Sequence, residues 1–139
     1  MEPLPYVDEH TESVTAPPEA VWTALLTVLR RSMGGSAALA HALGCDPAEA
    51  TAAFDGLPGQ SIPGFRVVEA EPGRHLALRG RHRFATYALT FDLDQGRLRA
   101  RTHAAFPGVL GSLYRAAVIG TGGHRIVTRH LLRQVARAA

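Results

Sequence analysis

His124 is the residue of this 139-residue chain whose type and position best suit chemistry. Histidine titrates near neutral pH and can both donate and accept hydrogen bonds. Residues 108 to about 137 have the period of one amphipathic helix of about eight turns, with His124 on the face that we expect to pack on the core. We expect His124 to hydrogen-bond a ligand or to transfer a proton. The alternative is a structural histidine bonded to a backbone carbonyl.

The same helix face is unusually small near its middle, where it presents Ala116, Gly120 and Gly123. Interior glycine costs a helix ~1 kcal/mol relative to alanine, so glycines persist there where a neighbour comes close or where space must stay open. We expect open space, and therefore a ligand cavity. The other apolar residues of this face are Val109, Leu113, Ala117, Val127, Leu131 and Val135. An arc of arginines lies opposite them (Arg115, Arg125, Arg129, Arg133 and Arg137).

From residue 65 onward the hydrophobic period changes to two, which predicts strands at 65–71, 75–80, 83–93 and 97–106. A two-residue turn at Gln95-Gly96 sets the register of the last hairpin. It pairs Leu89 with Thr102, Phe91 with Ala100 and Tyr87 with Ala104 on the buried face, and it pairs Asp92 with Arg99 on the outer face, where His103 also lies.

We interpret the buried residues of this hairpin as cavity wall. Tyr87, Leu89, Phe91, Ala100 and Thr102 are therefore candidate ligand-binding residues, with ordinary core as the alternative for Tyr87 and Thr102. The register of the preceding hairpin leaves open whether Glu69 faces inward or outward.

The first half of the chain is predicted to hold one strand and several helices. A strand at 7–15 is ended by Pro17-Pro18, which then start an amphipathic helix over 18–31 with Trp22 as a packing anchor. A further turn or two is expected at 37–43. Asp46, Pro47 and Glu49 have the pattern of a helix start, so a short helix is expected over 47–54, followed by a loop over 55–64.

The order of strand, helices, antiparallel meander and long C-terminal helix predicts an α+β fold. It resembles the START-like (SRPBCC, Bet v 1-like) helix-grip superfamily, which includes polyketide cyclases/dehydrases and lipid transporters. The resemblance is carried by HTESVTAPPEAVWTAL at 10–25, the meander at 64–106 and YRAAVIGTGGHRIVTRHLL at 114–132. It implies a curved sheet that grips the last helix around an internal cavity. We count about five strands where the superfamily usually has six or seven, which leaves open a further strand near 60–62 or a shortened sheet.

These features predict a single START-like domain over 1–139 that binds or transports a small hydrophobic molecule. The alternative function is a polyketide cyclase-like or dehydratase-like enzyme with His124 as general acid or base. No cofactor is expected, and no metal site, because the chain lacks HExxH and has one cysteine. His10 and Glu12 share a strand face as a weak pair.

Composition excludes several classes of protein. No apolar run is long enough to span a membrane, so we expect no stable membrane insertion. The net charge of +3 comes with fifteen arginines and no lysine, and no aromatic residues interleave the helical arginines, so we expect no nucleic-acid partner. The basic segment 80–83 is interpreted as a solvated turn, or as a contact for an anionic headgroup. We expect a bacterial, cytoplasmic protein that is a monomer or homodimer.

Overall fold

A six-stranded antiparallel sheet in the order β1-β6-β5-β4-β3-β2 forms one layer of the computed structural model, which describes residues 4–34, 37–120 and 122–139. The strands are β1 (Tyr6–Ser13), β2 (Ser61–Ile62), β3 (Phe65–Glu71), β4 (His75–Arg81), β5 (Thr86–Asp94) and β6 (Arg97–Ala105). The first strand therefore pairs with the last, and β2 to β6 form a meander. The short β2 answers the question of the further strand near 60–62, because it pairs with the start of β3.

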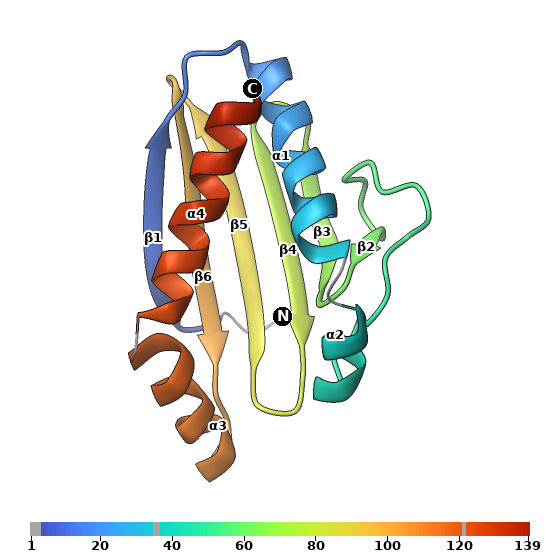
Figure 1. The fold of residues 1–139 in the computed structure, drawn as a ribbon, viewed down its shortest axis with the longest axis vertical. Helices are drawn as coiled ribbons and strands as arrows, with labels where there is room; N and C mark the ends of the chain where they lie inside the picture. The colour runs from blue at the N-terminus through green and yellow to red at the C-terminus, as the bar shows by residue number, and fades with distance from the viewer. Residues whose placement is uncertain (1–3, 35–36, 121) are drawn as a thin grey trace.

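Helices form the second layer (Figure 1). They are α1 (Pro18–Gly34), α2 (Ala37–Leu43), α3 (Gly108–Arg115), a π-helical segment η1 (Ala116–Gly120) and α4 (Gly123–Ala138). α1 and α4 lie side by side on one face of the sheet, and α4 also contacts β1 and β6. This is the α+β helix-grip arrangement that the sequence predicted.

The core lies between these two helices and the sheet. Leu25, Leu29, Phe91, Leu132 and Val135 are among its fully buried side chains. Because side chains alternate along each strand, those on one face of the sheet pack in this core. Helical spacing places one stripe of side chains from each helix against them. Trp22 is buried in it, as expected of a packing anchor.

The register of the β5–β6 hairpin is confirmed. Leu89 pairs with Thr102, Phe91 with Ala100, Tyr87 with Ala104 and Asp92 with Arg99. Gln95 and Gly96 both have positive φ angles, of 49° and 73°, as a turn of two left-handed residues requires.

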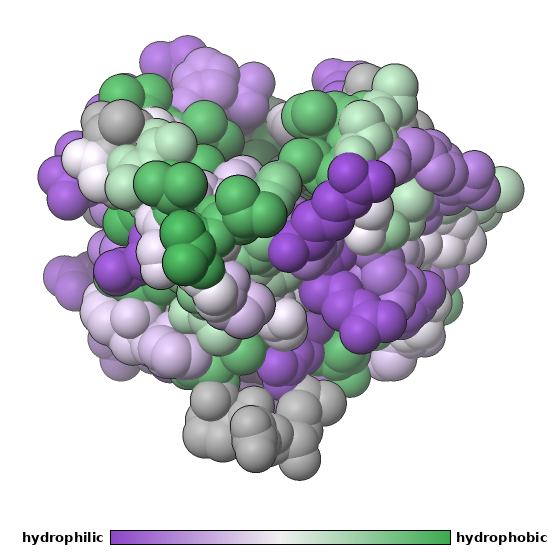
Figure 2. Space-filling model, turned by 90° about the horizontal axis from the view of Figure 1, so that it is seen from below, coloured by the Kyte–Doolittle hydropathy of each residue, from purple (hydrophilic) through white to green (hydrophobic). Residues whose placement is uncertain are grey.

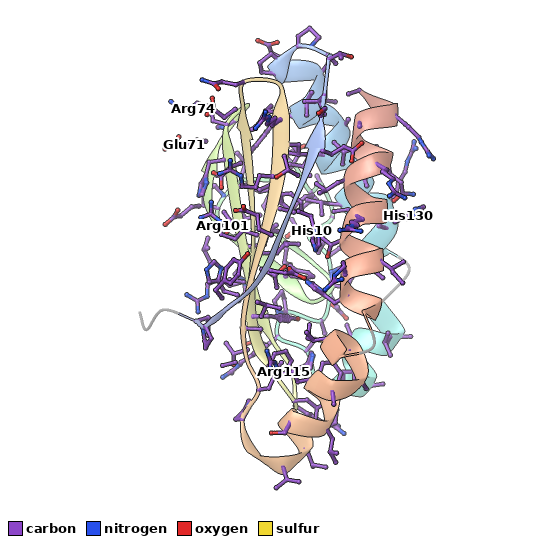
Figure 3. The ribbon with its side chains drawn as sticks, turned by 90° about the vertical axis from the view of Figure 1, so that its left-hand side faces the viewer. His10, Glu71, Arg74, Arg101, Arg115 and His130 are labelled. Atoms are coloured by element: carbon purple, nitrogen blue, oxygen red, sulfur yellow. The ribbon has the colours of Figure 1, made fainter. Side chains whose placement is uncertain are left out.

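The outer face of the sheet carries charged side chains, of which Glu71, Arg74 and Arg101 point away from the helices (Figure 3). Glu69 also lies outward, because a bulge between Val67 and Glu69 shifts the β3–β4 register. Its carboxylate lies 3.1 Å from Nε2 of His75, whose Nδ1 lies 2.7 Å from Asp92.

Two helix predictions are wrong. Residues 47–54 form no helix, because their backbone groups pair with distant partners: Thr51 N donates to Ser61 O, Gly64 N donates to Pro47 O, and Asp46 pairs with Arg81. Nor is the C-terminal segment one helix. The break falls between Gly120 and Gly123, and Gly122 has a left-handed φ of 78°.

The break turns α3 away from α4, so that α3 lies at the end of the sheet where β6 finishes (Figure 1). There Gly111 packs so closely that an added Cβ would lie 2.7 Å from the carbonyl carbon of Phe106. Val109, Leu113 and Val127, which we expected to face inward, are exposed, whereas Leu131 and Val135 are buried as expected. The helix-grip fold persists because α4, side by side with α1, still packs on the sheet over β1 and β6.

Candidate functional site

A cavity of about 490 Å³ opens at the α2–α3 end of the molecule, between the sheet and the helices. Figure 2 looks onto this end and shows a hollow with hydrophobic side chains on both sides. Its size falls in the range of small-molecule sites. The described residues that line it are Leu39, Ala40, Leu43, Cys45, Pro63, Gly64, Phe65, His82, Ala85, Tyr87, Ala88, Leu89, Thr102, Ala104, Phe106, Tyr114, Val118, Ile119, His124 and Val127.

The lining is apolar with a few polar groups. Within the described part of the chain, none of the residues that line this cavity is an arginine, lysine, aspartate or glutamate. Two other hollows differ in this respect. One of about 630 Å³ lies beside Trp22 and includes Glu19, Arg74 and Asp94, and one of about 600 Å³ lies on the charged outer face of the sheet. The α2–α3 cavity is therefore the one suited to an apolar molecule.

Aromatic rings gather at one end of this cavity. Tyr114 of α3 stacks on Phe84 with ring centroids 5.4 Å apart, and it meets the His82 ring edge-on at 4.8 Å. Phe65 and Tyr87 make a further edge-to-face contact at 5.1 Å. Such contacts fix ring orientation beyond what burial alone achieves.

Tyr87 is held by polar contacts at this wall. Its hydroxyl donates to the carbonyl oxygen of the buried Gly64 at 2.5 Å, and the Cys45 thiol lies within hydrogen-bonding reach. Burial raises the pKa of Tyr87, and the nearby Cys45 raises it further. Burial also raises the pKa of the Cys45 thiol, which opposes formation of a nucleophilic thiolate. Both groups are therefore neutral hydrogen-bonding groups in this site.

His82 lies in the tight turn between β4 and β5. Its backbone N donates to Ala85 O at 2.9 Å, and the Phe84 backbone N donates to His82 Nδ1 at 3.1 Å. Burial lowers the pKa of His82, so the imidazole is favoured in its neutral form.

His124 borders the cavity from the first turn of α4. Its Nε2 lies 3.1 Å from Thr102 Oγ1 on β6 and 3.4 Å from Asp8 Oδ1 on β1. The β6 register and the phase of α4 together bring these groups into contact. The neighbouring His10 points from β1 toward α4 (Figure 3) and lies 3.3 Å from Asp8 through Nε2. The arrangement is a small polar cluster at the edge of an apolar cavity.

The structure places four of the nine candidate ligand-binding residues at the cavity: Tyr87, Leu89, Thr102 and His124. Phe91 and Ala100 are fully buried in the packed core farther along the same strands. The remaining three, Ala116, Gly120 and Gly123, do not line the cavity.

Gly120 corrects our interpretation of the small helix face. It is exposed, and nothing lies within 4 Å of where a Cβ would be, so it leaves no internal space. The physical reason is the break in the helix, which gives α3 and η1 a different direction from α4 relative to the sheet.

Several lining residues escaped the sequence analysis. Cys45 and α2 reach the cavity because the backbone of Asp46 forms a β-bridge with Arg81. No local sequence pattern predicts this long-range contact. His82 was assigned only to a basic segment. The aromatic Phe84, two residues later, is the sequence feature that could have indicated packing at this position. Arg81, within the same segment, lies near the Asp46 carboxylate rather than in the cavity.

Other kinds of site find no support in the described residues. In residues 4–34, 37–120 and 122–139, no three histidine, cysteine, aspartate or glutamate side chains form a group that could hold a metal ion. Over the same ranges, no helix combines the length and apolar character needed to cross a bilayer.

Comparisons with known proteins give fold likenesses. No protein-family model and no curated protein matches the sequence. Among solved structures, protein CV1439 from Chromobacterium violaceum is similar with a TM-score of 0.58 and 18% identity over 96% of each chain. MLL2253 from Mesorhizobium loti has a TM-score of 0.56 and 12% identity over 94% of each chain. Ms6760 from Mycobacterium smegmatis has a TM-score of 0.52 and 12% identity over 96% of each chain. At such identities the likeness shows a shared fold, and these names state no activity.

Proposed function

We propose, from the START-like helix-grip fold of this chain, that it binds or transports a small hydrophobic molecule in the α2–α3 cavity. The observation that carries the proposal is the uncharged, largely apolar lining of a cavity of about 490 Å³. Removing apolar surface from water is the main favourable term for an uncharged guest. Polar groups such as Tyr87 and the His124–Thr102 pair supply orientation.

The test fills part of the cavity by enlarging a small side chain that lines it. Ala104 lines the cavity from β6, whereas the adjacent Ala105 belongs to the opposite face of the sheet. We expect the wild type to bind the uncharged fluorescent dye Nile red, Ala104→Leu to lose most of that binding, and Ala105→Leu to retain it. Equal binding by the three proteins, or no binding by any of them, would contradict the proposal.

Native mass spectrometry of protein purified from its own cells tests whether a molecule is carried. We expect a co-purified apolar compound in the wild type and its loss in Ala104→Leu. The compound also identifies the ligand class directly.

A second candidate function is favoured by the contact of His124 with Asp8. A carboxylate beside an imidazole orients the ring, as a general acid or base requires. The candidate is a cyclase-like or dehydratase-like enzyme in which His124 transfers the proton. In that case the wild type would hold product and His124→Gln would hold unconverted substrate, so the co-purified masses would differ. A binding protein would carry the same compound in both.

A further inference from the structure

His82 presents a hydrogen-bond donor for which the described chain supplies no acceptor. Because the Phe84 N–H donates to Nδ1, that nitrogen carries no proton, and the proton of the neutral ring lies on Nε2. Among residues 4–34, 37–120 and 122–139, no hydrogen bond or ion pair includes His82 Nε2. The Nε2–H is therefore available to donate to an acceptor on a bound molecule.

The ring that carries this donor is fixed in place. The Phe84 N–H holds its other nitrogen, and the rings of Tyr114, Tyr87 and Phe84 surround it at centroid distances of 4.8, 5.5 and 5.9 Å. A donor that is already oriented loses little conformational entropy when it binds a ligand. These contacts suit His82 to recognising a hydrogen-bond acceptor at one position on a ligand.

The cavity also selects against charge. No arginine, lysine, aspartate or glutamate lines it, and burial lowers the pKa of His82 and so disfavours the imidazolium. A ligand carboxylate or ammonium would be buried without a counter-ion, which is costly. An uncharged carbonyl or ether oxygen carries no such penalty.

We propose that His82 is the specificity-determining residue of this cavity, and that its Nε2–H donates to an uncharged oxygen on an aromatic ligand packed against Tyr87 and Tyr114. This inference rests on the proposed binding function and adds the chemical class of the ligand. The neighbouring rings supply stacking surface, while the His82 imidazole donor distinguishes a carbonyl compound from a hydrocarbon of the same shape.

Three probes of one shape test the inference by displacement of Nile red. They are fluorene, its ketone 9-fluorenone, and fluorene-9-carboxylate, which is charged at neutral pH. For the wild type we expect 9-fluorenone to displace Nile red at concentrations about 3- to 10-fold lower than fluorene, as one neutral hydrogen bond implies. Fluorene-9-carboxylate should be the weakest of the three.

Two variants separate the donor from the structural role of the ring. In His82→Asn the side-chain amide can still accept from the Phe84 N–H but reaches no farther, so the preference for 9-fluorenone should fall to about 1-fold while fluorene still binds. His82→Gln places an amide N–H near the former Nε2 and should restore part of the preference. His103→Asn, on the outer face of β6 beside Tyr6, is the matched control and should behave as the wild type. Circular dichroism spectra check that each variant is folded.

The outcomes distinguish this inference from the proposed function. If neither Nile red nor fluorene binds the wild type, the cavity-binding proposal fails. If both bind but fluorene and 9-fluorenone are equivalent, or if His82→Asn keeps the preference, cavity binding stands and the role of His82 is overturned. Tightest binding by the carboxylate would overturn the uncharged-ligand class.

Discussion

Gly80 on β4 is the position where one added methyl group should do most damage to the cavity wall. A Cβ there would overlap the carbonyl oxygen of Gly64 and lie 2.9 Å from the Tyr87 hydroxyl. The obstacle includes backbone, which cannot rotate aside as a side chain can. Gly80→Ala must therefore push the Pro63-Gly64 segment away from β4 and separate Tyr87 from the carbonyl to which it donates.

The magnitude follows from two terms. Overpacking a tight interior typically costs about 1–3 kcal/mol. Leaving the Gly64 carbonyl without its donor costs about 1–3 kcal/mol more, since the carbonyl is buried. Alanine is better than glycine in a strand by roughly 0.5–1 kcal/mol, which offsets part of the loss. We expect the free energy of unfolding to fall by ~1–5 kcal/mol, measured by urea denaturation.

Gly120→Ala is the matched control because the substitution is the same and nothing lies within 4 Å of the new methyl group. It should be neutral or should stabilise the protein by up to ~1 kcal/mol through helix propensity. The double variant Gly80→Ala/Tyr87→Phe should lose less stability than the sum of the two single variants. Both changes remove the same hydrogen bond, from the Tyr87 hydroxyl to the Gly64 carbonyl. A Gly80→Ala stability within about 0.5 kcal/mol of wild type would refute this account of the wall.

Three further predictions concern other parts of the molecule. Hydrogen bonding to Asp92 raises the pKa of His75, so His75→Gln should cost most stability below about pH 6.5 and progressively less as the pH rises through the raised pKa, as urea denaturation across pH will show. Gly122→Ala, at a left-handed φ of 78°, should lower the free energy of unfolding by ~1–2 kcal/mol. Ala100→Leu, in fully packed core, should cost ~1–3 kcal/mol, whereas Ala104→Leu in the cavity should cost less.

The parts of the fold that the sequence predicted best are those set by short-range rules. The β5–β6 register follows from alternation and from a turn whose two residues, Gln95 and Gly96, both adopt positive φ. The start of α1 follows from Pro17-Pro18, because proline suits the first helical turn. Five candidate wall residues depended on that register. Tyr87, Leu89 and Thr102 line the cavity, whereas Phe91 and Ala100 lie in the packed core.

The failures come from long-range competition. The capping pattern at Asp46 to Glu49 is a sound helix signal, but the segment pairs its backbone with Ser61, Gly64 and Arg81 instead. Local propensity is a weak prior that tertiary contacts override. The position of Cys45 in the cavity wall depends on the same pairing, so no local pattern could reveal it.

The C-terminal glycines show how one correct observation led to a wrong structure. Each of Gly120 and Gly123 would cost a continuous helix ~1 kcal/mol, and we interpreted them as a sign of open space beside the helix. The chain avoids the cost by breaking the helix with a left-handed Gly122. Because the break lets α3 turn to the end of the sheet, Tyr114 reaches His82 and Phe84 and closes the aromatic end of the cavity. The glycines thus shape the cavity by redirecting a helix, and a variant that made residues 108–138 one continuous helix would remove its aromatic wall.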